Sequence, residues 1–227
     1  MTSLQIFRIS GLSLFVGAVA FIVHIVARSV ITAGPDPATF AKELLWVPIN
    51  ALGAAGAALV LLGLPGMYAR MAGATGWLGM VGVVLLASSW MFLGVFLTLY
   101  SVLVLPWLAD TAPSLVAAST PLPLGFVVAF VAGPVAWFVG AVLLAIPFIR
   151  GRVQPRWVGY VLPTSGLWMV VGNVLIAPSG PATNLAINLI SNLGSVLLLV
   201  GVGYLGSQKW SEHAPTDQAD STAVTHA

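Results

Sequence analysis

The sequence predicts an all-α integral membrane protein, a polytopic bundle of six transmembrane helices with both termini in the cytoplasm. The first feature that supports this class is the residue content: only 6% of the residues are charged and 59% are hydrophobic. The second is the mean hydropathy of +1.04. A soluble globular domain carries about 25% charged residues. A soluble fold of 227 residues also has too little interior to enclose so much apolar surface. The third feature is a series of apolar runs of about 20 residues, the length that crosses the hydrocarbon core of a bilayer.

Six such runs follow one another along the chain. They cover residues 9–31, 44–68, 76–105, 122–149, 157–177 and 183–205. In the connections, Pro37 is suited to the first turn of a helix, and residues 111–118 are expected to form a short interfacial helix. Residues 1–206 therefore form the predicted transmembrane domain, and the polar segment 207–227 is predicted to be a disordered cytoplasmic tail.

The distribution of Lys and Arg predicts the orientation, because cytoplasmic loops carry an excess of these residues. One set of loops and ends holds Arg8, Arg70, Arg150, Arg152, Arg156 and Lys209. The other set holds only Arg28 and Lys42. We therefore predict a multi-pass membrane protein with both termini in the cytoplasm. The tryptophans near the predicted helix ends, which include Trp46, Trp107 and Trp157, are expected to anchor these ends at the membrane interfaces.

Two stretches of the spans carry a resemblance to known proteins. They read Leu-Leu-Gly-Leu-Pro-Gly-Met-Tyr-Ala-Arg over residues 61–70 and Pro-Arg-Trp-Val-Gly over residues 155–159. In these stretches the chain resembles small, uncharacterised bacterial integral membrane proteins with six spans. The resemblance covers the spans and not the tail. It implies a bacterial cytoplasmic (inner) membrane as the location, and it implies no activity, cofactor or site residue.

A cluster of polar residues interrupts the apolar runs in their outer halves. Its members are His24, Arg28, Glu43, Asn50, Tyr100, Asn173, Asn184, Asn188 and Asn192. Polar groups are costly in hydrocarbon, so they pair with one another or line a cavity. Because these residues share one depth, the cluster predicts a pocket that opens to the outside or to the outer leaflet.

The ligand-binding candidates in this cluster are one arginine and five asparagines. They are Arg28, Asn50, Asn173, Asn184, Asn188 and Asn192. The last predicted helix carries a stripe of polar residues on one face, made of Asn184, Asn188, Ser191, Asn192 and Ser195. Hydrogen bonds between helices, a ligand site and a water-filled cleft would each explain the stripe. Arg28 needs a partner, and Glu43 is the best-placed carboxylate, with Asp36 as the other candidate.

The sequence contains none of the common catalytic or phosphate-binding motifs. Cysteine is absent and His24 is the only histidine in a predicted span, so we expect neither a metal site nor a cofactor. The leading hypothesis is a protein without catalytic function that binds a small or lipophilic ligand in its outer half, or serves as an accessory subunit of a membrane complex. The expected partners are the lipid bilayer, a lipophilic molecule, and other membrane subunits or further copies of the chain, but not nucleic acid.

Two alternatives stay open from the sequence. One is a membrane enzyme of the isomerase or cyclase type acting on a lipophilic substrate, with His24 or Glu43 as the acid or base and Tyr100 as an auxiliary donor. The other is a small-molecule transporter. A transporter would need a path through the inner half, where Thr164 and Ser165 are among the few polar residues.

Overall fold

The computed structural model describes residues 3–32, 37–116, 121, 123–150, 153, 155–171 and 185–211, and within these ranges every regular element is a helix. Three helical segments are long and apolar enough to cross a membrane. They lie in α1 (Ser3–Ile31), in the continuous stretch Trp46–Thr111 and in α6 (Leu124–Ile149). The predicted all-α class is confirmed, and the three apolar helices agree with a membrane protein.

The helix α3 (Trp46–Trp90) folds back on itself at Gly76, which has a φ of 60° and a ψ of −155°. This backbone conformation is essentially restricted to glycine. The indole Nε1 of Trp90 donates a hydrogen bond to the carbonyl oxygen of Ala57 at 3.0 Å. A straight helix would hold these two residues about 50 Å apart, so the segments before and after Gly76 are antiparallel. We call them the first limb and the second limb of α3.

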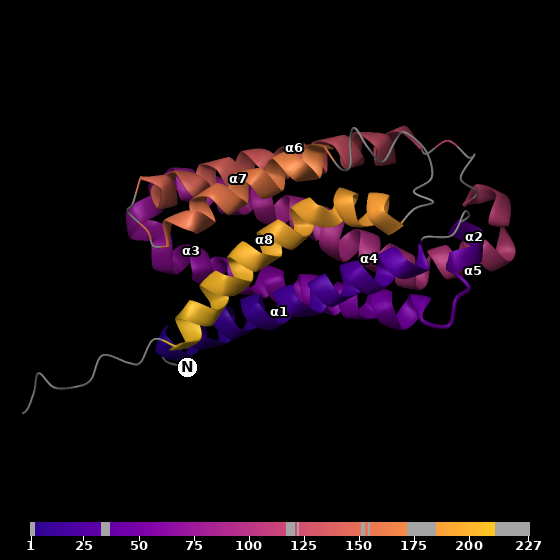
Figure 1. Ribbon diagram of the computed structural model, residues 1–227, viewed down its shortest axis with the longest axis horizontal. Helices are drawn as coiled ribbons and strands as arrows, with labels where there is room; N and C mark the ends of the chain where they lie inside the picture. Colours follow the sequence, from indigo (N-terminus) through magenta and orange to yellow (C-terminus); the bar gives the residue numbers. More distant parts are fainter. Residues whose placement is uncertain are drawn as a thin grey trace, which may run out of the picture.

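The second limb continues through three further helical elements. These are the π-helix η1 (Met91–Phe96), α4 (Leu97–Leu103) and α5 (Leu105–Thr111). The short helix α2 (Pro37–Phe40) begins at the predicted proline and lies beside α5 (Figure 1). The helix predicted over 111–118 is smaller than expected, because only the 3-10 turn η2 (Pro113–Leu115) follows α5 in the described residues.

The remaining helices are α6, α7 (Arg156–Val170) and α8 (Leu185–Ser211). The α8 helix continues to Ser211, so it includes the first residues of the segment that the sequence assigns to the polar tail. The rest of that tail lies outside the described residues.

The helices form a closed sequence of neighbours. The first limb of α3 packs on α1, the second limb on α6, α6 on α7, α7 on α8, and α8 returns to α1 (Figure 1). Glycines allow the backbones to approach closely at the crossings, as is common in membranes. A Cβ atom on Gly140 would lie 2.8 Å from the carbonyl oxygen of Gly82, and a Cβ on Gly17 would lie 2.7 Å from that of Gly56.

The bundle has two distinct ends. One contains Gly76, the start of α1 and the connection from α6 to α7, and we call it the Gly76 end (Figure 1). The other contains α2, α5 and the start of α3, and we call it the Trp46 end. The chain therefore brings the residues of the predicted polar cluster that the structure describes to the Trp46 end or to the half of the bundle next to it.

Candidate functional site

The contacts between helices at the Trp46 end converge on the side chain of Trp46. Its side chain is completely buried, and its indole Nε1 donates a hydrogen bond to the carbonyl oxygen of Ser101 at 2.8 Å. The guanidinium carbon of Arg28 lies 5.5 Å from the centre of the Trp46 ring, within the range of a cation–π interaction. The Phe40 ring lies 4.9 Å away on another side. Trp46 therefore joins α1, α2 and α4, and the sequence-based interpretation of this residue as an interfacial anchor is wrong.

Asn50 lies one turn after Trp46 and has 0% of its surface exposed. Its Nδ2 donates a hydrogen bond to the carbonyl oxygen of Trp46 at 2.8 Å. Its Oδ1 is buried and has no hydrogen-bond partner among the described residues. A buried acceptor without a partner costs about 1–3 kcal/mol, and buried polar groups in folded proteins are nearly always paired. The side-chain oxygen of Asn50 is therefore a buried acceptor of this end that lacks a partner among the described residues.

His24 lies against the same part of α3. Only 2% of its surface is exposed, and its Nδ1 is 3.0 Å from the carbonyl oxygen of Ile49. Because a carbonyl oxygen can only accept, the proton of the neutral ring is on Nδ1. Gly53 makes room for the imidazole, since a Cβ at this position would lie 2.6 Å from His24 Cγ. Phe21 packs on the ring at a centroid distance of 5.0 Å.

The arginine and the carboxylate that were expected to pair do not meet. In the part of the chain that the structure describes, the ion pair at this end joins Lys42 Nζ to Asp110 Oδ1 at 3.0 Å. Glu43 lies in the exposed turn between α2 and α3, whereas Arg28 reaches the face of Trp46. The predicted Arg28–Glu43 pair is therefore wrong, because the guanidinium lies on an aromatic ring, whereas Asp36, the other candidate carboxylate, lies outside the described residues.

The three candidate acid–base groups lie in different environments. His24 is enclosed by α1 and α3, and Glu43 is exposed. Tyr100 is half-buried; it packs at the edge of the apolar cluster around Trp46, and its ring centre lies 6.2 Å from that of Phe126. Proton transfer requires its acid and base within hydrogen-bond reach of one substrate atom. The different burial of His24 and Glu43 gives no support to such a pair.

The other candidate asparagines lie mostly outside the described residues. This applies to Asn173 and Asn184, and to the side chain of Asn188. Asn192 is described and is half-buried in α8. Ser195, on the same predicted polar face, donates its hydroxyl proton to the sulfur of Met169 on α7, with Oγ and Sδ 3.2 Å apart. At this point the face serves the packing of α8 against α7.

Two hydroxyl groups on α4 also belong to the site, although no sequence pattern singled them out. Thr98 and Ser101 are both buried, and each donates its hydroxyl proton to a carbonyl of the preceding helical turn. The π-helix η1 comes directly before them, and its Gly94 lies close to Ala57 of the first limb. A π-helical turn is wider than an α-helical one and is frequent at functional sites. The spacing of Trp46, Asn50 and Gly53 on one helix face was the only available signal for this interface.

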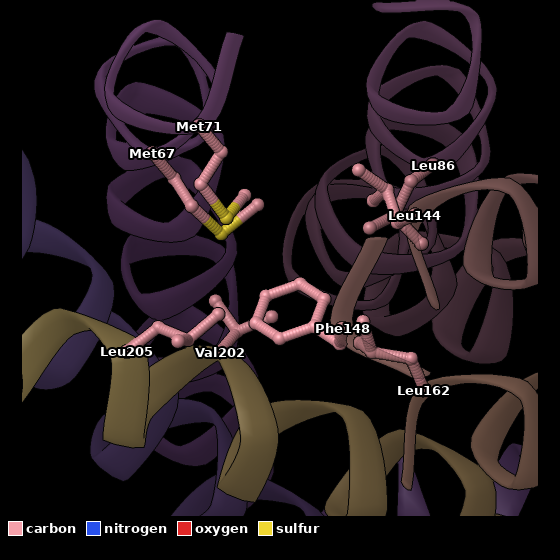
Figure 2. Close-up of a pocket in the computed structure, with 8 residues that line it drawn as sticks. All are labelled: Met67, Met71, Leu86, Leu144, Phe148, Leu162, Val202 and Leu205. Atoms are coloured by element: carbon pink, nitrogen blue, oxygen red, sulfur yellow. The ribbon is translucent and has the colours of Figure 1, made fainter. Parts of the chain in front are cut away.

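The Gly76 end contrasts with this site. Its interior holds a narrow apolar space within which a water molecule does not fit. The space is lined by Met67, Met71, Leu86, Leu144, Phe148, Leu162, Val202 and Leu205. Figure 2 shows the two methionine sulfurs side by side above the Phe148 ring. The lining offers only apolar atoms and thioethers, so it has no group for orienting a polar ligand.

Among the described residues, no group of three or more acidic or histidine side chains is arranged to hold a metal ion. No protein-family model, curated protein or solved structure matches this chain.

Proposed function

We propose that the chain crosses a bacterial cytoplasmic membrane six times and has both termini in the cytoplasm. The spans would be α1, the first limb of α3, the second limb with its continuation through α4, and the helices α6, α7 and α8. Neighbouring segments along the chain run in alternating directions (Figure 1). Exposed arginines gather at the Gly76 end, namely Arg8, Arg70, Arg150 and Arg156. This charge distribution supports a cytoplasmic Gly76 end.

The absence of cysteine makes this topology simple to test. Thr39 at the Trp46 end and Gly73 at the Gly76 end are both exposed, and each can be replaced by cysteine in separate variants. In intact cells, a membrane-impermeant maleimide should label Thr39→Cys and should label Gly73→Cys only after the membrane is opened. The reverse labelling pattern would contradict the proposed orientation.

For this membrane protein we further propose a binding function without catalysis: the Trp46 end holds a small lipophilic molecule. The observation that carries this proposal is the buried Oδ1 of Asn50, which lacks a partner among the described residues. A bound molecule that donates a hydrogen bond would offset the cost of burying this oxygen. The ring of Trp46, one helical turn from Asn50, and the Phe40 ring that packs on it suit the apolar part of such a molecule.

The two ends of the bundle favour binding over the other functions considered. His24 and Glu43 differ in burial, which weakens the case for an acid–base pair. The interior of the Gly76 end is filled by apolar side chains such as Leu144 and Phe148, which offer no polar path for a transported solute. We therefore propose that the lipophilic molecule is bound at the Trp46 end and not at the Gly76 end.

Native mass spectrometry of the full chain, extracted with its surrounding lipids, tests the proposal. We expect a small molecule that stays bound to the wild type and to Thr164→Leu, which changes an exposed polar residue of α7, but not to Asn50→Leu. Wild-type protein without any bound molecule would contradict the proposal. A stoichiometric second protein in place of a small molecule would favour an accessory subunit.

A further inference from the structure

We infer that the molecule bound at Asn50 is a neutral lipophile that carries a hydroxyl group, such as an alcohol or a phenol, rather than a ketone or an ether. This inference rests on the proposed binding function and specifies its ligand class. Some hydrogen-bonding atoms at the Trp46 end already have partners, and the ligand class follows from those that do not.

Asn50 offers an acceptor that is not yet used. One proton of its amide nitrogen is donated to the carbonyl oxygen of Trp46 at 2.8 Å, whereas its Oδ1 has no partner among the described residues. An amide oxygen accepts hydrogen bonds and never donates them. A ligand that has only acceptor atoms would therefore leave Oδ1 unpaired.

His24 has the same polarity. Its Nδ1 proton is directed at the carbonyl oxygen of Ile49, which directly precedes Asn50. In the neutral ring the other nitrogen, Nε2, is an acceptor. His24 and Asn50, on this part of the interface between α1 and α3, therefore each offer an acceptor to a molecule that donates a hydrogen bond.

The neighbouring helix does not supply the donor. The hydrogen bond from Trp46 to Ser101 and the contact of Ala57 with Gly94 place this part of α4 and η1 opposite the first limb. Thr98 lies between these two contacts, but its hydroxyl donates to carbonyl oxygens of the preceding turn in η1, and the hydroxyl of Ser101 donates to a carbonyl oxygen of α4. These two hydroxyl protons are thus already used, and among the described residues Oδ1 of Asn50 is left for the donor of a bound molecule.

Charge distinguishes a hydroxyl from an ammonium donor. The guanidinium of Arg28 lies on the Trp46 ring, and Asn50 is one helical turn from Trp46. A second positive charge this close would be repelled strongly in a poorly hydrated environment. A neutral hydroxyl meets the requirement for a donor without this cost.

Two matched probes test the ligand class: 4-nonylphenol and its methyl ether, 4-nonylanisole. They share the same ring and alkyl chain, and only the phenol donates a hydrogen bond. Binding to the full chain in lipid nanodiscs is measured by isothermal titration calorimetry. We expect the wild type to bind the phenol about tenfold more tightly, since a net difference of 1.4 kcal/mol corresponds to a factor of ten. In Asn50→Leu this preference should disappear, and Thr164→Leu should keep it.

The outcomes separate this inference from the proposed function. Equal binding of both probes by the wild type would overturn the inference, and this comparison needs no variant that folds. If the wild type binds both probes equally and Asn50→Leu binds both more weakly, the site stands and its ligand class is wrong. If neither probe binds, the co-purified molecule decides: a hydroxyl group in it supports the inference, and a molecule without one overturns it. Absence of any bound molecule overturns the proposed function as well.

Discussion

The two ends of the bundle use different means to hold the same helices together. At the Gly76 end, side chains such as Met67, Leu144 and Phe148 meet through apolar contacts, and the hydroxyl of Ser10 on α1 adds one hydrogen bond to the carbonyl oxygen of Gly63 at 2.7 Å. At the Trp46 end, Trp46 and His24 each make a hydrogen bond to a backbone carbonyl of another helix, and Asn50 makes one within its own helix. Lipid tails are as apolar as leucine, so apolar contacts in a membrane act through close packing rather than through the hydrophobic effect. A buried polar group without a partner costs much more there, so we expect function at the Trp46 end, where the Oδ1 of Asn50 has no partner among the described residues.

The largest expected effect comes from filling the space that accommodates His24. In Gly53→Leu the new Cβ would lie 2.6 Å from the imidazole, so α1 and α3 must separate and the Trp46 end must open. We expect a loss of about 3 kcal/mol in the free energy of unfolding, near the upper part of the range for overpacked cores. Reversible unfolding in mixed micelles measures this loss.

Gly73→Leu is the matched control for this substitution, because Gly73 belongs to the same helix and a Cβ there meets no atom within 4 Å. Its free energy of unfolding should change by less than about 0.5 kcal/mol. Equal losses in the two variants would show that the contact at the Trp46 end is no more sensitive than an open position.

An intermediate effect is expected for the contact of Arg28 with Trp46. The ring and the guanidinium are 5.5 Å apart in a largely enclosed place, so their coupling should be about 1.5 kcal/mol. A double-mutant cycle with Arg28→Met and Trp46→Phe, measured by unfolding, isolates this coupling. A coupling near zero would mean that the arginine contributes only its alkyl chain.

Asn50→Leu should have a smaller effect, and in the opposite direction. Without ligand, the variant removes a buried carbonyl that has no partner among the described residues, so its free energy of unfolding should rise by about 1 kcal/mol. The matched change at the other end is Met71→Leu, an apolar exchange that should cost less than about 1 kcal/mol. If Asn50→Leu is strongly destabilised in ligand-free protein, the asparagine is a structural residue rather than a binding one.

The smallest effect is expected at the surface of the Trp46 end. Lys42 and Asp110 form an ion pair in which both side chains are more than half exposed, at 52% and 70%. Exposed pairs contribute little and are screened by salt. Lys42→Met should therefore lower the free energy of unfolding by about 0.3 kcal/mol at low salt, and the difference should vanish in 1 M NaCl. A loss that persists in salt would show that this pair belongs to the structured site.

Patterns within single helices were predictable from the sequence, and contacts between helices were not. Apolar runs located α1 and α6 closely, and Pro37 marked the start of α2. The positions of Trp46 and Arg28 were misjudged, because the partner of each lies on another helix and distance along the sequence does not encode it. His24 and Asn50 were candidates because their side chains are polar. Only the fold shows that the His24 ring contacts the part of the first limb that carries Asn50.

The reversal at Gly76 also affects how the protein is made. The two limbs of α3 are joined through one residue with a positive φ, and the hydroxyl of Tyr68 donates a hydrogen bond to the carbonyl oxygen of Gly76 at 3.3 Å. In the proposed topology, so short a connection leaves no polar loop between the two spans. The two limbs would then enter the membrane together as a helical hairpin, with Arg70 beside the turn favouring a cytoplasmic tip. The membrane entry of the two proposed spans would thus be coupled through the conformation of one glycine.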